Sequence, residues 1–412
     1  IKHMHKYNSE FLNFINERGF LNQISDAESL DKIFMNKGVS AYIGFDCTAP
    51  SLHIGSLIQI MLLKYLQEFD HNPIILVGGG TSKVGDPSLK DKSRSLLEEK
   101  DIQDNLNGIK KTFGRFIDLK KDGAVVIDNN DWLGKLNYID FLREVGSNFS
   151  VNRMLSFDSV KLRLEREQPL SFLEFNYMVM QGYDFYELNK RYGCVLQMGG
   201  SDQWGNIVCG IDLARRLSGV NLYGLTTPLL TTSSGHKMGK TENGAIWLNF
   251  DENANSHSTH PRDFWNYWRD KTDNDLVGPW MRLFTDLSLK EINEYESLQG
   301  EEIESAKEIL ATKITEMVHG KNSNWNSLEI FKIDKPQIKK GIGLLNLLSK
   351  EFLKLTNSNS ESRRFVKSSA IKLNENLILD EKYIVTINDF DKSQKLKVSL
   401  GKKKNIIIQI MD

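Results

Sequence analysis

The sequence predicts an α/β protein with a parallel sheet, followed by a helical region and a small α+β segment. Short apolar, β-prone runs recur along the first part of the chain, and helix-patterned stretches separate them. The five runs cover residues 41–45, 73–77, 124–127, 194–198 and 225–230. This alternation is typical of a parallel sheet that helices cover on both faces. A chain of 412 residues has room for two or three domains.

The first run leads into a turn and a buried helix. Pro50 ends the strand, and an almost wholly apolar helix begins at Leu57. Such a unit directs free backbone N–H groups and the positive helix end toward the turn, where a phosphate can bind. His53 can donate a hydrogen bond to a phosphoryl oxygen, and Gly55 lets a flat adenine approach the backbone. The basic stretch KMGKT at 237–241 favours this interpretation over a histidine that only satisfies a nearby carbonyl.

Polar or glycine-rich clusters follow three of the runs, at residues 78–80, 128–131 and 199–203. Ligands of open α/β sheets bind at the carboxyl ends of the strands, so we expect these clusters to converge on one crevice. Two other phosphate motifs fit less well. Gly80 and Gly85 have the spacing of a Walker loop, but Asp86 and Pro87 follow where Lys-Ser/Thr is required. Lys83 stands where a dinucleotide fingerprint needs its third glycine.

From Pro261 to about residue 320 the pattern becomes helical and amphipathic. The aromatic residues of this stretch are expected to form its core: Phe264, Trp265, Tyr267 and Trp268. Residues 253–260 are polar and predict a loop. His257 and His260 lie in it without an acidic or thiol partner, so an ordinary loop is favoured over a metal site.

The end of the chain is basic. Residues 334–341 and 356–359 have the composition of linkers, and Ser358 with Glu361 predicts a capping box that opens a helix. From residue 361 to 404 eleven Lys and Arg stand against six Asp and Glu, an excess of +5. This surplus predicts a small RNA-binding surface, with an ordinary solvated face as the alternative.

Composition excludes several classes of protein. The net charge of −1 excludes a globally basic nucleic-acid binder, although not a local basic patch. Cys47, Cys194 and Cys209 show no CxxC pair and no metal-ligand spacing, which favours a reducing cytoplasm. No run approaches the roughly 18 to 20 apolar residues of a membrane span.

Five motifs in order resemble those of bacterial-type tyrosyl-tRNA synthetases, a family of class I aminoacyl-tRNA synthetases. They are YIGFDCTAPSLHIGS, GDPSLKDKSR, YMVMQGYDF, LQMGGSDQWGNI and KMGKT. The resemblance covers essentially the whole chain. It implies a Rossmann-like catalytic domain at 1–250, with an insertion at about 131–195 that forms a homodimer interface and a lysine loop at 237–241. An α-helical anticodon-binding domain at 251–335 and a ribosomal-protein-like RNA-binding domain at 350–412 would follow.

The resemblance also implies residue roles. The residues expected around L-tyrosine are Tyr42 and Asp184 at the phenol, Asp86, Tyr177 and Gln181 at the α-ammonium group, and Gln203 near the carboxylate. Those expected at the ATP base and ribose are Gly44, Asp46, Gly55, Ser56, Gly200 and Asp202. The triphosphate would meet His53, Thr48, Lys90, Arg94, Lys237, Lys240 and Thr241. Expected RNA contacts are Arg363, Arg364, Lys367, Lys402, Lys403 and Lys404. Ser56 stands where this family often has histidine, and Gly239 stands where the class pattern has serine.

The implied reaction joins tyrosine to ATP, giving tyrosyl-adenylate and pyrophosphate, and then transfers tyrosine to the 3′ end of tRNA(Tyr). The attacking carboxylate is already ionised, so the site needs no general base; it needs donors and cations around the phosphates. Mg²⁺ is expected to enter with ATP rather than to occupy a protein metal site. No membrane partner is expected.

Three other functions compete with this one. A tryptophanyl-tRNA synthetase shares the first motif, but Tyr42 and Asp184 suit a phenol better than an indole. A small adenylyltransferase also shares it, but the length and the basic tail argue against that class. A non-catalytic RNA-binding protein on the same scaffold should have lost its phosphate ligands, whereas His53, Lys237 and Lys240 are present.

Overall fold

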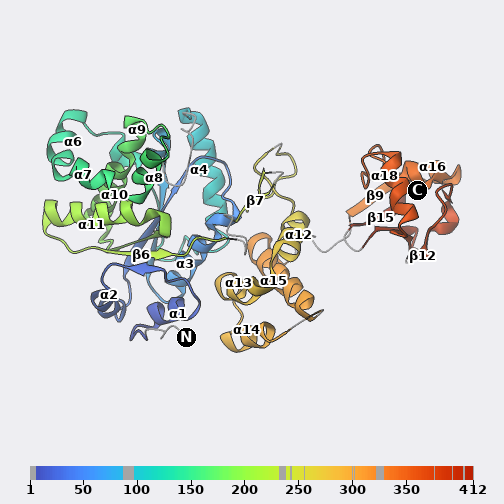
Figure 1. The fold of residues 1–412 in the computed structure, drawn as a ribbon, viewed down its shortest axis with the longest axis horizontal. Helices are drawn as coiled ribbons and strands as arrows, with labels where there is room; N and C mark the ends of the chain where they lie inside the picture. The colour runs from blue at the N-terminus through green and yellow to red at the C-terminus, as the bar shows by residue number, and fades with distance from the viewer. Residues whose placement is uncertain are drawn as a thin grey trace. The chain divides into compact units, whose positions relative to one another are not determined.

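The computed structural model describes residues 6–86, 97–231, 238–241, 244–254, 256–298, 300, 302–321, 329–374, 376–391, 393–401 and 404–411. The chain divides into two compact units, Ile1–Ser323 and Asn324–Asp412 (Figure 1). Within the described ranges, no helix is both long and apolar enough to cross a membrane.

A six-stranded sheet organises the first unit, in the order β1-β6-β5-β2-β3-β4. Its parallel strands are β2 (Ser40–Asp46), β3 (Asn72–Gly78), β4 (Val125–Asp128), β5 (Leu196–Gly200) and β6 (Tyr223–Thr227). All five predicted runs are therefore confirmed as strands. The last ends at Thr227 instead of residue 230, because Pro228 has no N–H group for the ladder. The short β1 (Gln23–Ile24), which was not predicted, pairs antiparallel at the edge.

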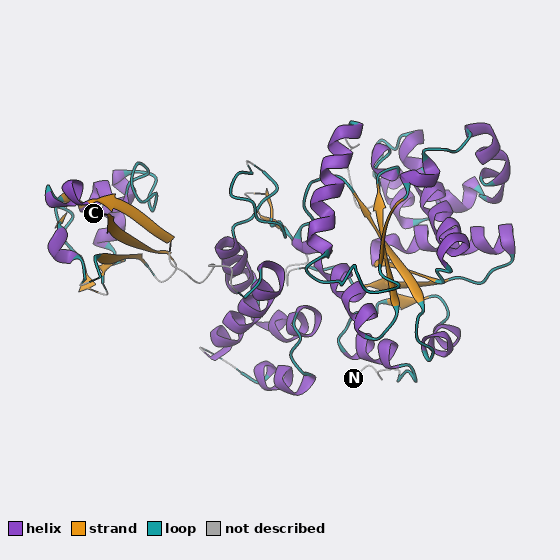
Figure 2. Ribbon diagram, turned by 180° about the vertical axis from the view of Figure 1, so that it is seen from behind, coloured by secondary structure: helices purple, strands orange, loops and turns teal. Residues whose placement is uncertain are grey.

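Helices cover both faces of this sheet, as predicted (Figure 2). On one face lie α3 (Leu57–Glu68) and α4 (Glu99–Phe113), and on the other α10 (Tyr177–Tyr192) and α11 (Trp204–Ser218). Successive strand residues point to opposite faces, so Ile43 and Ile75 join one core while Tyr42 and Ile74 join the other. Burial on both faces explains why these strands read as continuous apolar runs.

Short helices occupy the region of the predicted insertion between β4 and α10. They are α5 (Asn130–Leu133), α6 (Tyr138–Glu144), α7 (Val151–Leu155), α8 (Asp158–Glu165) and α9 (Phe172–Phe175). Figure 1 shows α6 to α9 gathered beside α10 and α11.

The predicted helical region is confirmed. It consists of α12 (Pro261–Lys271), α13 (Val277–Phe284), α14 (Leu289–Glu296) and α15 (Glu302–His319). Phe264 and Trp268 are fully buried, but in the same hydrophobic core as α1 (Glu10–Glu17), α2 (Ala27–Phe34) and α3. The predicted boundary at residue 250 therefore does not separate two compact units, because one continuous core spans it.

The second unit is built on a five-stranded sheet in the order β12-β11-β14-β15-β9. Its strands are β9 (Glu329–Asp334), β11 (Ile371–Leu373), β12 (Asn376–Leu377), β14 (Lys395–Leu400) and β15 (Lys404–Met411), with a small pair of β10 (Ile342–Gly343) and β13 (Ile384–Val385). Its helices are α16 (Lys335–Lys339), α17 (Leu344–Leu348) and α18 (Asn359–Lys367).

Two expectations for this unit differ from the structure. Residues 334–341 are not a linker, since Asp334 ends β9 and Pro336 lies in the first turn of α16, where a proline is tolerated. The unit also begins before residue 350, because β9 pairs in parallel with β15. The predicted capping box forms in half: the Ser358 side chain accepts a hydrogen bond from the backbone N–H of Glu361, but the Glu361 carboxylate accepts from the backbone N–H of Asn357 at 2.7 Å instead of from Ser358.

Candidate active site

A cavity of about 260 Å³ lies at the carboxyl ends of the parallel strands. Residues from the ends of β2, β3 and β5 line it, as do residues of α10 and the segment after β6. The expectation that the polar clusters converge on one crevice is confirmed, since Gly78, Asn129 and Gly200 all reach the cavity.

Most of the predicted site residues line this cavity. They are Tyr42, Gly44, Asp46, His53, Gly55, Ser56, Asp86, Tyr177, Gln181, Asp184, Gly200, Asp202 and Gln203. Thr48 is not among the lining residues and lies exposed after β2. Lys90, Arg94 and Lys237 lie outside the described residues. Lys240 and Thr241 form the short strand β7 (Lys240–Thr241), which pairs with β8 (Gly244–Ala245). The structure describes the backbone of these two residues but not their side chains.

Asp184 is a buried carboxylate at the cavity wall. The Asn129 side-chain amide donates to it at 2.9 Å, and the Trp132 indole N–H donates to its other oxygen at 2.8 Å. Burial raises the pKa of Asp184 to about 7, with smaller contributions from Asp46 and Asp128, against the lowering effect of both hydrogen bonds. The two donors hold this carboxylate in one orientation facing the cavity.

Tyr42 lies beside Asp184 with its hydroxyl oxygen buried and, within the described residues, without a hydrogen-bond partner. Burial, and then the charge of Asp184, raises the pKa of Tyr42 well above its ordinary value. Gln197, its partner in the β2–β5 register, is also buried and lines the cavity, and its Oε1 has no partner within the same residues. Buried polar groups without partners are rare, so this wall is suited to a polar ligand.

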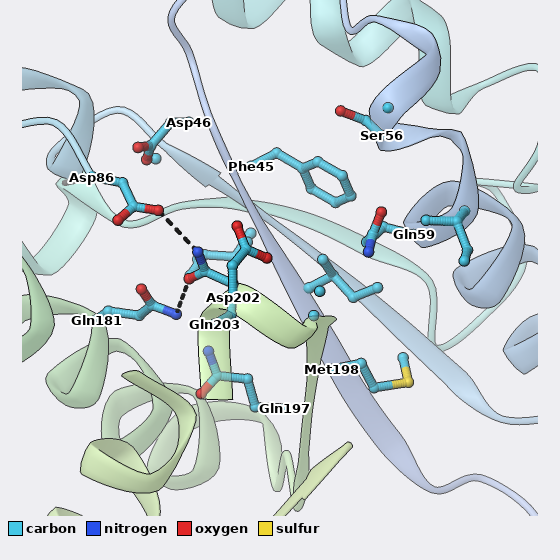
Figure 3. A pocket seen from close by; sticks show the side chains of 18 of the residues that line it. Phe45, Asp46, Ser56, Gln59, Asp86, Gln181, Gln197, Met198, Asp202 and Gln203 are labelled. Atoms are coloured by element: carbon cyan, nitrogen blue, oxygen red, sulfur yellow. Dashed lines mark hydrogen bonds between the residues drawn. The ribbon is translucent and has the colours of Figure 1, made fainter. Parts of the chain in front are cut away.

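A hydrogen-bonded chain of side chains forms a second wall (Figure 3). Gln203 donates from Nε2 to Asp86 at 2.9 Å and accepts from Gln181 at 3.3 Å. Asn206 donates to Gln181 at 2.9 Å and to Gln203 at 3.2 Å. Nearby, Asp46 accepts from Tyr177 at 3.0 Å. The network orients carboxylate and amide oxygens that can accept hydrogen bonds from an ammonium group.

The turn that carries His53 differs from the prediction. The backbone N–H groups of residues 54–56 are all bonded within the chain: Ile54 to the Ile246 carbonyl, Gly55 to Nδ1 of His53, and Ser56 to the His53 carbonyl. They are therefore not free for a phosphate. Because Nδ1 accepts from Gly55, the proton of the neutral imidazole lies on Nε2, which leaves that atom as the donor. The absent side chain of Gly55 makes room for the His53 ring, since a Cβ there would lie 2.6 Å from Cε1.

The remaining sequence-predicted residues lie in the second unit. Arg363, Arg364 and Lys367 are exposed on α18, with Arg363 at 3.9 Å from Glu381. Lys402 and Lys403 lie outside the described residues, as does the side chain of Lys404. Within the described residues, no group of three or more His, Cys, Asp or Glu could hold a metal ion.

Sequence reasoning missed several residues of the site. They are Asn129 and Trp132 behind Asp184, Asn206 in the amide chain, Gln197, and the buried Met238 that lines the cavity. Asn129 belongs to a polar cluster that the sequence placed at the correct end of the sheet. Nothing in the sequence indicated that its partner would be Asp184, because the two meet only when β4 and α10 pack together.

Comparisons with known proteins identify the family of the chain. The family model described as tRNA synthetases class I (W and Y) matches residues 35–332. The tyrosine–tRNA ligase of Wolbachia pipientis is 49% identical over 425 residues, covering 99% of each chain. That of Beijerinckia indica is 51% identical over 423 residues, covering 98% of each chain. A solved C-terminally truncated mitochondrial tyrosyl-tRNA synthetase from Aspergillus nidulans is 31% identical, with a TM-score of 0.66, covering 76% of this chain and 91% of that one. The chain therefore belongs to the class I tRNA synthetases of the tryptophan and tyrosine family.

Proposed function

We propose that this class I synthetase activates L-tyrosine with ATP to tyrosyl-adenylate and transfers the tyrosyl group to tRNA(Tyr). The observation that carries the proposal is the pair of Tyr42 and Asp184 at a buried cavity wall, with Asn129 and Trp132 fixing the carboxylate. A phenol can donate to Asp184 and accept from Tyr42. Phenylalanine would leave both groups desolvated and unpaired, which costs more than one lost contact.

The amide chain supports the placement of the amino-acid backbone. Asp86, Tyr177 and Gln181 would hold the α-ammonium group, and Gln203 would lie near the reacting carboxylate. Asp46 and Asp202 would contact the ATP base and ribose, together with the lining residues Gly44, Gly55, Ser56 and Gly200.

In the proposed reaction, a carboxylate oxygen of tyrosine attacks the α-phosphorus, and the bond to the pyrophosphate oxygen breaks. The rate comes from positioning and from neutralising the charge that develops on the phosphates. His53 would donate from Nε2 to a phosphoryl oxygen. Thr48, Thr241 and four basic residues are predicted to add contacts there: Lys90, Arg94, Lys237 and Lys240. Mg²⁺ would enter with ATP, bound mainly by phosphate oxygens.

Pyrophosphate exchange with each of the twenty amino acids tests the substrate. We expect exchange with tyrosine alone. Asp184→Ala should be nearly inactive, whereas Asp104→Ala, on the exposed side of α4, should exchange like the parent. Exchange with tryptophan and none with tyrosine would instead assign the tryptophan branch of the family.

A homodimer through the region 131–195 is supported by unusually exposed apolar side chains. Tyr138 and Ile139 are 61% and 60% exposed, Val151 is 58% exposed and Phe172 is 71% exposed. Exposed apolar side chains often mark a protein interface. Light scattering on the protein as it elutes from a size-exclusion column should give twice the monomer mass. Phe172→Lys should lower the measured mass toward that of the monomer. A monomeric parent protein would exclude this interface.

We propose that the second unit binds tRNA through α18 and the basic residues 402–404, in the cytoplasm. Arg363→Glu together with Arg364→Glu should weaken tRNA binding and flatten its dependence on salt, because fewer counterions are then released. Pyrophosphate exchange should not change. Equal charging of tRNA by the parent and the variant would show that α18 is an ordinary solvent-exposed helix that does not bind tRNA.

A further inference from the structure

Residues 246–248 pair with the segment that carries His53. The backbone N–H of Ile54 donates to Ile246 at 3.0 Å, and that of Leu248 donates to Leu52 at 2.8 Å. His53 and Trp247 are therefore direct partners in an antiparallel bridge. Residues after the lysine loop are thus paired with the first motif through backbone hydrogen bonds.

Three aromatic rings contact one another in a row at this bridge: His53, Trp247 and His257. The centroids of His53 and Trp247 are 6.2 Å apart with the planes at 72°, and those of Trp247 and His257 are 4.7 Å apart at 65°. His53 lines the cavity, but neither Trp247 nor His257 does. Trp247 therefore lies between the cavity histidine and His257 of the loop 253–260, for which the sequence suggested no function.

Thr259, near the end of this loop, contacts the segment that carries Trp247. Thr259 accepts from the backbone N–H of Trp247 at 2.8 Å and donates its own N–H to Asn249 at 3.1 Å. His257 has a left-handed backbone with φ of 57°, which costs of order 1 kcal/mol for a residue with a side chain. Such a conformation persists only when its surroundings hold it, and here it places the His257 ring against the indole.

The backbone N–H groups of residues 54–56 are already bonded within the chain, so phosphate binding at this turn depends on the orientation of the His53 side chain. Its imidazole lines the cavity and carries a side-chain donor on this turn. Gly55 fixes one edge of the ring through Nδ1 at 3.0 Å, and Trp247 lies beside the ring. A rotation of the imidazole would break the first contact and disturb the second.

We propose that Trp247 is a positioning residue that holds the His53 imidazole toward the triphosphate, and that His257 supports it from the loop 253–260. This inference rests on the proposed role of His53 in adenylation. A small displacement of a catalytic donor can lower a rate about 100-fold, so the effect is large enough to measure.

A double-mutant cycle on the full chain tests the coupling. His53→Ala, Trp247→Ala and the double variant are compared in single-turnover adenylate formation at saturating ATP and tyrosine. We expect each single variant to be slowed at least about ten-fold, and the double variant to be no more than about two-fold slower than His53→Ala, because both changes remove the same contact. Tyrosine affinity, measured by equilibrium dialysis, should stay within about two-fold of the parent. Trp247→Phe should recover most of the rate and covers the case in which Trp247→Ala fails to fold.

The two loop histidines provide a matched control. His257→Ala removes the ring behind Trp247 and should slow adenylation several-fold. His260→Ala, three residues further on, removes a ring that packs on Phe250 and the acceptor that caps Arg262 at the start of α12. It should lower the thermal midpoint without slowing adenylation.

The outcomes separate the two proposals. A parent-like rate for His53→Ala would overturn the proposed role of His53 and this inference with it. If His53→Ala forms adenylate slowly but Trp247→Ala forms it at the parent rate, the inference alone is overturned. The same holds if the rate losses of the two single variants multiply in the double variant. Equal slowing by His257→Ala and His260→Ala would remove the specific role of the loop.

Discussion

The side-chain amide of Asn129 donates to the carboxylate of Asp184 at 2.9 Å, across 55 residues of sequence. Asn129 follows β4, whereas Asp184 lies in the middle of α10. The same amide group accepts from the backbone N–H of Gly80 at 2.8 Å, so one side chain links the ends of β3 and β4 to the carboxylate at the cavity wall. The position of Asp184 is therefore set by the sheet as well as by its own helix.

The indole N–H of Trp132 should contribute to tyrosine binding without touching the ligand. Trp132→Phe removes one donor to Asp184, and the free energy of binding should weaken by about 1 to 2 kcal/mol, roughly five- to thirty-fold in affinity. ATP affinity should not change. Trp265→Phe is the control, since it deletes an indole N–H that donates to Thr312 away from the cavity. Unchanged tyrosine affinity in Trp132→Phe would mean that Asn129 alone orients Asp184.

The raised pKa of Asp184 predicts a pH dependence of stability in the absence of ligand. In the unfolded chain this carboxyl titrates near its ordinary pKa of 3.8, but in the folded protein burial raises its pKa to about 7. Between these values the folded state holds a proton that the unfolded state has lost, so its contribution to stability falls as pH rises from about 4 to about 7. The total is at most about 4 kcal/mol.

Asp184→Asn removes this titration and leaves the other carboxyls in place. We therefore expect the difference in urea midpoint, parent minus Asp184→Asn, to decrease as the pH is raised from 5 to 8 in the absence of tyrosine. Parallel pH profiles for the two proteins would show that the pKa of Asp184 is not raised.

The limits of the second unit make a prediction about truncation. A chain that ends at Ser323 lacks the whole unit, and it should exchange pyrophosphate with tyrosine but fail to charge tRNA. A chain that ends at Ser349 keeps β9, α16 and α17 without the strands they pack on, which exposes Ile333, Ile338 and Leu347. It should aggregate, as followed by light scattering. Equal solubility of the two truncations would contradict the boundary at residue 323.

Arg18 predicts a large loss of stability from one substitution. Its buried guanidinium donates to the backbone carbonyls of Arg282, Thr285 and Leu287, and so joins α1 to the end of α13. Arg18→Met removes the guanidinium donor from all three carbonyls, of which Thr285 keeps the Tyr65 hydroxyl at 3.2 Å, and should cost about 2 to 5 kcal/mol of unfolding free energy. Lys32→Met breaks the exposed pair with Glu28 and should leave the urea midpoint almost unchanged. Similar midpoints for the two variants would show that the Arg18 bonds contribute little.

The sequence by itself determined the strands, the order of the motifs and the end of the sheet at which the site lies. These follow from local properties: Ile43 and Ile75 belong to runs whose β preference and burial agree, and the polar residues that end such runs share one edge of a parallel sheet. The tertiary structure decided which polar groups meet. The sequence predicted free N–H groups around His53, but the N–H of Ile54 donates to the carbonyl of Ile246, 192 residues further along the chain.

The difference between local sequence information and tertiary packing also applies to the boundary between the two compact units and to the residues that support the site from behind. Phe264 and Trp268 were correctly predicted as core, yet only packing showed that they share a core with α3. The linker-like composition of residues 334–341 could not reveal that β9 finds its partner in β15, near the end of the chain. Asn129, Trp132 and Trp247 contact residues distant in sequence. Local propensity contains no information about such partners, because burial and hydrogen bonding at these positions are satisfied only after the elements have packed.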